Sequence, residues 1–142
     1  MQFHEALRMG KRVEEQVLYC IQKKYPSATI IDKYKGYDIW IPETNFGIEV
    51  KCDTMSNETG NFVIEFEFNG KPSAILTTKA KYWVFYDDHK FIWITPTQII
   101  NCIFQSKQTF ATFVGNGDKV PKKAFLIKKT ELIKYAIAEN TI

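Results

Sequence analysis

The sequence has few of the residues that build several familiar kinds of site. Only two histidines occur, His4 and His89, which argues against histidine-based nucleases and against a Ser-His-Asp hydrolase. The three cysteines, Cys20, Cys52 and Cys102, stand far apart and form no CxxC pair, so neither a zinc site nor a disulfide framework is indicated. We expect each cysteine to be a small buried or half-buried side chain.

Long apolar segments are missing as well. No run approaches the roughly 18 apolar residues of a membrane-spanning helix. Residues 1–5 are not followed by the apolar stretch that a signal peptide has. We therefore expect a protein that does not enter membranes and that stays in the cytoplasm.

Arginine is scarce, because Arg8 and Arg12 are the only two. Bidentate recognition of guanine usually uses arginine, so sequence-specific reading of DNA is disfavoured. The net charge of +3 is unevenly spread: residues 1–104 carry 12 Lys and Arg against 13 Asp and Glu, and residues 105–142 carry 7 lysines against 3 acids. This distribution fits a carboxylate site near a polyanion-binding surface, although an ordinary solvated lysine-rich face explains it equally well.

The chain length of 142 residues, without linkers or repeats, predicts a single domain over residues 1–142. Hydrophobic spacing and turn residues predict a helix, then antiparallel strands, then mixed elements, which is an α/β or α+β sandwich. The helices are expected at residues 4–24, 97–104 and 130–138, the last one capped by Thr130. The strands are expected at residues 29–31, 37–41, 46–52, 62–68, 82–86, 90–94 and 124–127, with a short helical turn within 73–81 and a basic loop over 106–123.

The two strands expected at residues 37–41 and 46–52 carry the most informative charges. Because side chains alternate along a strand, Glu49 and Lys51 share one face, and their even-numbered neighbours should point into the core. If the strands pair as a hairpin with residue numbers that add to an odd value, such as 38 opposite 49, Asp38 joins them on that face. An even sum would place Asp38 on the opposite face from Glu49 and Lys51 and would contradict this hypothesis.

Charged groups on central apolar strands need an explanation, because an unpaired buried charge is unfavourable. A divalent cation supplies one, since Mg²⁺ takes oxygen ligands and often combines one or two carboxylates with substrate phosphate. We expect Asp38, Glu49 and the carbonyl of Val50 to hold Mg²⁺, for which Mn²⁺ could substitute. Lys51 would then orient or activate the attacking water. The alternative that spacing alone leaves open is an acid–lysine salt bridge on a half-exposed hairpin.

The spacing of Asp38, Glu49 and Lys51 resembles the signature of the PD-(D/E)xK nuclease superfamily, an Asp, a gap of about ten residues and then Glu-x-Lys. The resemblance implies a restriction-endonuclease-like fold, in which a central mixed β-sheet is flanked by helices. It also implies Mg²⁺-dependent hydrolysis of phosphodiester bonds in DNA.

The first helix extends this resemblance. Its segment Gly10-Lys11-Arg12-Val13-Glu14 is similar to the start of Holliday-junction-resolvase-like members, in which a glycine precedes a glutamate by four residues. Glu14 is expected on the apolar face of the helix, an odd place for a charge, which favours it over Glu15 as the residue that assists the site. The resemblance implies a role for Glu14 through a second metal ion or an outer-shell water.

A later segment, residues 70–85, is similar to a block with the pattern K-P-S-G-I…T-K-A-D-Y-W in phage and bacterial nuclease-like proteins, so a phage protein in a host cytoplasm fits too. Here Ala74 stands in place of the glycine and Lys81 in place of the aspartate. The resemblance implies that this segment lies near the active site, where four of its residues could contact phosphate, unless they are ordinary turn and capping residues. These four are Ser73, Thr77, Thr78 and Lys79. From their charge, Lys119, Lys122 and Lys123 are further candidates for contacts with the phosphate backbone.

Together these patterns predict a metal-dependent DNA endonuclease that is structure-selective or non-specific, acting for example on branched DNA in recombination or repair. A restriction-type endonuclease is an alternative within the same class. A nuclease-like module that binds nucleic acid without cutting it is an alternative from another class, and a purely structural protein would have no metal affinity. A symmetric homodimer would suit cutting of two strands, although no residue demonstrates one.

Overall fold

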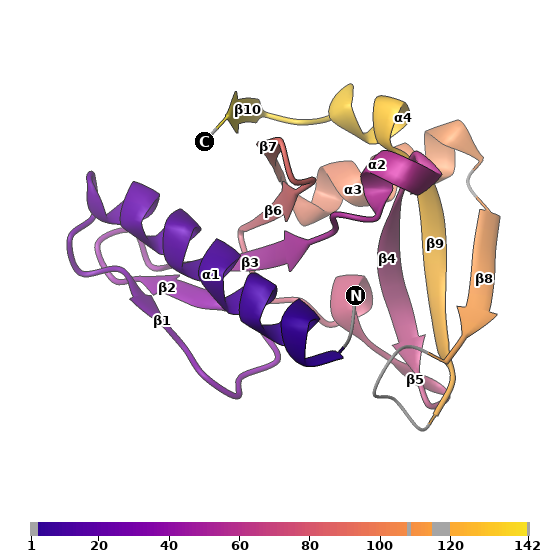
Figure 1. The fold of residues 1–142 in the computed structure, drawn as a ribbon, viewed down its shortest axis with the longest axis horizontal. Helices are drawn as coiled ribbons and strands as arrows, with labels where there is room; N and C mark the ends of the chain where they lie inside the picture. Colours follow the sequence, from indigo (N-terminus) through magenta and orange to yellow (C-terminus); the bar gives the residue numbers. More distant parts are fainter. Residues whose placement is uncertain (1–2, 108, 115–119, 142) are drawn as a thin grey trace.

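The computed structural model describes residues 3–107, 109–114 and 120–141 of the chain. These residues form two β-sheets and four α-helices, a mixed α+β fold as the sequence predicts (Figure 1). No helix in the described ranges has both the length and the apolar character needed to cross a membrane.

The larger sheet has six strands and is mixed, because β3 pairs with β6 in parallel while its other pairings are antiparallel. In spatial order the strands are β1 (Thr29–Ile30), β2 (Ile39–Ile41), β3 (Phe46–Cys52), β6 (Tyr82–Tyr86), β7 (Lys90–Ile94) and β10 (Ala138–Thr141). This arrangement confirms the expected central mixed sheet and places β3, which carries Glu49 and Lys51, inside it.

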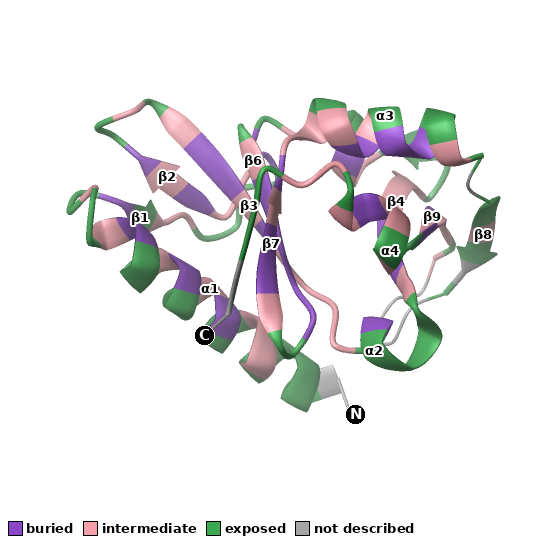
Figure 2. Ribbon diagram, turned by 90° about the horizontal axis from the view of Figure 1, so that it is seen from above, coloured by how far each residue is buried: buried purple, intermediate pink, exposed green. Residues whose placement is uncertain are grey.

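Helix α1 (Phe3–Gln22) covers one face of the larger sheet. Its buried residues Val13, Val17 and Ile21 recur every fourth position and pack with Ile48 and Val50 of β3, the even-numbered side chains that the sequence places in the core. In Figure 2 the buried residues of α1 and of the central strands are purple, and the outer side of the helix is exposed. The helix ends before Pro26, as expected.

The opposite face of the larger sheet packs against a second, antiparallel sheet and the remaining helices. In spatial order its strands are β5 (Lys71–Pro72), β4 (Asn61–Phe68), β9 (Lys122–Lys128) and β8 (Thr109–Phe113). The helices are α2 (Ser56–Thr59), the 3-10 turn η1 (Ala74–Leu76), α3 (Pro96–Ser106) and α4 (Lys129–Ile133). Trp83 and Phe85 of β6 are fully buried against Phe62 of β4 in this second core.

Four sequence-based expectations are wrong. Residues 109–113 are not a loop but strand β8, which pairs with β9. Thr130 does not cap the last helix, because α4 begins one residue earlier, and the helix ends at Ile133 rather than near 138. Residues 138–141 form β10, which pairs with the edge of β7. This pairing gives hydrogen-bond partners to backbone groups at the edge, and the local helical pattern of the sequence does not indicate it. Cys20 is exposed on α1 rather than buried.

Candidate functional site

The register of the β2–β3 hairpin brings Asp38 opposite Glu49. Ile39 pairs with Ile48, so that paired residue numbers add to an odd value, which is the condition that the hypothesis required. The backbone N–H of Asp38 donates to the carbonyl of Ile48 over 2.9 Å. Asp38 lies just before the first residue of β2. Its side-chain Oδ2 accepts a hydrogen bond from the backbone N–H of Val50 over 2.7 Å. This hydrogen bond fixes the carboxylate beside β3.

Glu49 and Lys51 lie together on the face of β3 that points away from α1. Lys51 Nζ is 3.3 Å from Glu49 Oε2, and it also lies 5.3 Å from the centre of the Trp83 ring. The indole nitrogen of Trp83 in turn donates to the hydroxyl of Thr78 over 3.0 Å. The lysine is therefore positioned by a carboxylate on one side and by an aromatic face on the other.

Two carboxylates near this point are hard to ionise. Burial, and then the negative charge of Asp38, raise the pKa of Glu49 to about 7 against the lowering effect of Lys51. Burial, and then Asp38 again, raise the pKa of Glu14 to about 7. Negative charge is thus crowded around Asp38, and a bound cation would relieve the crowding.

Glu14 and Asp38 line a common cleft. It is half-buried on α1 and lines a cleft of about 430 Å³ together with Asp38 and Val50, whereas Glu15 is exposed and does not line it. Asp38 lines both this cleft and the one that contains Glu49, so the two clefts adjoin at Asp38. The structure therefore places Glu14, rather than Glu15, near the carboxylates.

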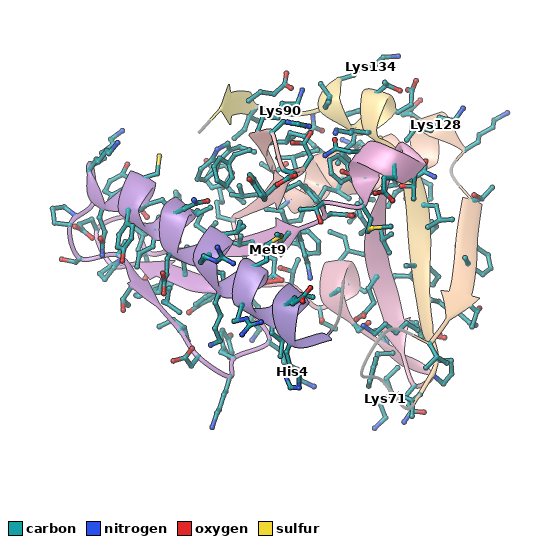
Figure 3. The ribbon with its side chains drawn as sticks, in the orientation of Figure 1. His4, Met9, Lys71, Lys90, Lys128 and Lys134 are labelled. Carbon is teal, nitrogen blue, oxygen red and sulfur yellow. The ribbon has the colours of Figure 1, made fainter. Side chains whose placement is uncertain are left out.

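Glu49 and Lys51 face a larger cleft of about 690 Å³ between the loop before β2 and the second sheet. Four further lysines line it: Lys35, Lys71, Lys79 and Lys122. Lys71 extends from the β4–β5 hairpin at the lower edge of the molecule in Figure 3, far from Lys134 at the top. Within the described residues, Lys35, Lys71 and Lys79 form no ion pair, so their charge is available to a polyanion.

The segment after Gly70 contributes three of its four predicted residues to this cleft: Ser73, Thr77 and Lys79 line it, and Thr78 does not. The Thr78 hydroxyl accepts from Trp83 and from the backbone of Ala80, and it donates to the carbonyl of Gly36. These bonds use its one donor and two acceptor sites, so Thr78 supports Trp83 instead of facing the cleft.

Ser73 is different, because its Oγ is buried beside the cleft and has no hydrogen-bond partner among the residues that the structure describes. Buried hydroxyls of this kind are uncommon and point to a missing polar partner.

The two predicted phosphate-binding lysines of β9 differ in whether they line the cleft. Lys122 lines the cleft and forms an ion pair with Glu65 at 3.5 Å. Lys123 pairs with Glu67 at 3.3 Å and does not line the cleft. Lys119, the third predicted phosphate contact, lies outside the described residues.

Sequence reasoning missed Tyr34, Lys35 and Lys71, which all line the cleft. Lys71 stands inside the segment singled out above, and Tyr34 is flanked by lysines in Lys33-Tyr34-Lys35. An aromatic residue between basic ones is a pattern typical of nucleic-acid contacts and was the available signal.

The residues of the site fit a divalent cation with oxygen ligands. The N–H and C=O of a strand residue point to the same side, so the Val50 carbonyl faces the side of Asp38, whose Oδ2 takes the Val50 N–H. In the described part of the chain no group of three or more His, Cys, Asp or Glu is placed to hold a metal. The proposed ligand set contains two acidic side chains, Asp38 and Glu49, and one backbone carbonyl, so it is smaller than a group of three. Mg²⁺ commonly completes its coordination at a site of this kind with water molecules and substrate phosphate.

Comparison of the chain with models of protein families, with curated proteins and with solved structures found no match.

Proposed function

We propose that the chain is a metal-dependent DNA endonuclease whose active site follows the PD-(D/E)xK pattern. The observation that carries this proposal is the hairpin register, which joins Asp38, Glu49 and Lys51 at one cleft. A simple salt bridge between Glu49 and Lys51 on a solvated hairpin would not need Asp38 as a second carboxylate. Asp38 adds to the effect of burial, which already raises the pKa of Glu49. The mixed sheet with flanking helices is the architecture that the resemblance implies, and a restriction-endonuclease-like fold is part of this proposal.

In this proposal Asp38, Glu49 and the Val50 carbonyl hold Mg²⁺. When bound, the ion lowers the pKa of a water molecule and offsets negative charge on the phosphate. Lys51 Nζ, fixed between Glu49 and the Trp83 ring, donates a hydrogen bond that orients the attacking water or stabilises the charge that develops on phosphate oxygen. Glu14 shares the adjoining cleft with Asp38, and in this proposal it assists the site from there through a second metal ion or an outer-shell water.

DNA is the proposed substrate because lysines dominate the cleft around the carboxylates. Lys35, Lys71 and Lys79 offer charge to phosphates without a planar guanidinium for reading bases. The expected cutting is therefore structure-selective or non-specific. Binding should weaken steeply as salt rises, because each neutralised phosphate releases counterions.

The test is cleavage of single-stranded, duplex and branched DNA in Mg²⁺, Mn²⁺ or EDTA by the natural chain and by Lys51→Ala. We expect metal-dependent cutting that EDTA and Lys51→Ala both abolish. The matched control is Lys81→Ala, because Lys81 also places its Nζ 5.3 Å from an aromatic ring, that of Phe46, yet lines neither cleft.

Cutting that persists in Lys51→Ala would assign the activity to another site. DNA binding without cutting in any metal would favour a nucleic-acid-binding module on this fold. The preferred substrate in the panel would separate branched-DNA enzymes from restriction-type enzymes.

A further inference from the structure

Tyr34 lies where the two clefts meet. It belongs to the loop between β1 and β2, and it lines the cleft of Glu14 as well as the cleft of Glu49. Asp38 is a neighbour in both clefts. Tyr34 is 41% exposed, so its ring is accessible from both clefts.

The Tyr34 ring is held in place rather than free in solvent. It meets the ring of Tyr37 edge-to-face, with centroids 4.8 Å apart, and Tyr37 stacks on Trp40 with centroids 5.4 Å apart and planes at 20°. A Cβ on Gly36 would come within 2.6 Å of the Tyr34 ring. A Cβ on Gly47 would come within 2.2 Å of the Tyr37 ring. Two glycines thus leave room for an ordered row of three aromatic rings whose outermost member faces the clefts.

Lysines flank this ring on both sides. Lys33 lines the cleft of Glu14 together with Lys11, and Lys35 lines the cleft of Glu49 with Lys71 and Lys79. A phosphate backbone that runs from one cleft to the other would pass Asp38 with lysines along its whole path. The base of the nucleotide at Asp38 would then meet Tyr34, and only an unpaired base exposes a face to stack on it.

We infer that Tyr34 is a stacking platform for an unpaired base next to the cleaved phosphate, so the substrate is single-stranded DNA or the unpaired part of a branched DNA. This inference rests on the proposed function, because it places the base relative to the carboxylates of that site. Tyr34 acts in positioning and specificity, and the ring face rather than the hydroxyl makes the contact.

The experiment measures binding of a single-stranded oligonucleotide that contains the fluorescent base 2-aminopurine, with the matching duplex as comparison. The full chain carries Lys51→Ala in Mg²⁺, so that the oligonucleotide is not cut. Adding Tyr34→Leu should weaken single-strand binding about tenfold and remove the quenching of 2-aminopurine that stacking causes, while duplex binding changes little. Adding Tyr34→Phe should preserve both the affinity and the quenching.

The matched control is Tyr19→Leu, because Tyr19 on α1 is 60% exposed but lines neither cleft. It should leave binding and quenching unchanged. Thermal unfolding of each variant shows whether the domain has stayed folded, and Tyr34→Gln, which also removes the ring at this exposed position, is measured if Tyr34→Leu unfolds.

Unchanged single-strand binding in Tyr34→Leu would overturn the inference, as would an equal loss of duplex binding or a Tyr34→Phe variant that loses quenching. If the natural chain cuts DNA while Tyr34→Leu binds normally, the inference fails and the proposed function stands. If the chain cuts nothing but quenching depends on the Tyr34 ring, the proposed function fails and stacking stands.

Discussion

Two carboxylate–lysine pairs flank the same central strands, and they differ in almost every physical respect. The Glu49–Lys51 pair faces a cleft, and burial raises the pKa of Glu49 to about 7. The Asp87–Lys129 pair joins the turn between β6 and β7 to the first residue of α4. Burial acts to raise the pKa of Asp87 too, but the hydrogen bond from Lys129 and two backbone N–H groups outweigh it and hold that pKa below its usual range.

The difference lies in how completely each carboxylate is hydrogen-bonded. Asp87 is 1% exposed, and its Oδ1 accepts from the backbones of His89 and Lys90 while its Oδ2 faces Lys129. Lys129 Nζ also donates to Asn57 over 2.8 Å, and Asn57 returns a hydrogen bond to the Asp87 carbonyl. Glu49 has its ion pair with Lys51 and a second carboxylate close by. A buried acid with every partner supplied stabilises the fold, whereas one left beside another acid has capacity for a ligand.

The largest predicted difference is in activity. Asp38→Asn should lower DNA cleavage on the order of 10³-fold because it removes a charge from the metal site. Its amide oxygen can still accept from the Val50 N–H, so the hairpin should remain folded. Asp87→Asn makes the same chemical change in the other pair and should keep cleavage near the natural level at a temperature where it is folded. An equal loss of DNA cleavage in Asp38→Asn and Asp87→Asn would show that the two carboxylates do not differ in function.

The second prediction concerns stability. Asp87→Asn should lower the free energy of unfolding by about 3 kcal/mol, because it leaves the Lys129 ammonium, 17% exposed, without its counter-charge. Glu49→Gln should not lower that free energy in metal-free buffer, since it relieves repulsion with Asp38. Urea unfolding of the two variants measures both. A Glu49→Gln variant that is as unstable as Asp87→Asn would show that Glu49 is a structural acid.

The third prediction is a pH dependence of opposite sign in the two pairs. The pKa of Glu49 is about 7 in the folded chain and near 4.5 unfolded, so between these values the folded chain binds more protons. The free energy of unfolding in EDTA should therefore fall as pH rises from about 4.5 to 7, by on the order of 2 kcal/mol, and stay flat above. The lowered pKa of Asp87 gives a contribution that is present above its ordinary value and is lost as the pH falls below it.

Urea unfolding across this pH range checks the sign, and Glu49→Gln is the control because it should remove part of the decrease. Adding Mg²⁺ at pH 8 should restore stability in the natural chain but not in Glu49→Gln. A natural chain whose stability rises from pH 5 to 8 in EDTA would contradict the assignment of the raised pKa.

The smallest predicted effect concerns Ser73, whose buried Oγ has no hydrogen-bond partner within the described part of the chain. Ser73→Ala should leave the free energy of unfolding unchanged or raise it by up to about 1 kcal/mol, since no hydrogen bond within the protein is lost. The same change should weaken DNA binding if phosphate is the missing partner. A loss of stability well beyond this range would mean that the hydroxyl has a structural partner.

Much of the site was predictable because it depends on local periodicity. Strands β6 and β7 lie at the residues expected, and the odd register of β2 and β3 follows from burying Ile39 and Ile48 on the same face. The alternation of side chains between the two faces of a strand depends only on neighbouring residues, so it can be inferred directly from the sequence.

The features that could not be predicted depend on contacts between distant segments. The expected helix over residues 130–138 stops at Ile133, and residues 138–141 pair with the edge of β7 instead. Residues 109–113 become a strand because β9 offers them an edge. Thr78, predicted to contact phosphate, turns inward because the buried indole of Trp83 needs an acceptor. Tyr34 lies over Gly36, which leaves space for its ring, and a loop approach of this kind is not visible in local periodicity.

The most direct test of the central claim is whether the Asp38–Glu49 pair binds a divalent cation. Calorimetric titration with Mn²⁺, in the presence of a single-stranded oligonucleotide, would compare Lys51→Ala with the double variant Lys51→Ala/Asp38→Asn. Lys51→Ala keeps both carboxylates while blocking turnover, so we expect Mn²⁺ binding there and an affinity at least about tenfold weaker in the double variant. Equal Mn²⁺ affinity in the two proteins would contradict the metal site and the hydrolysis that depends on it.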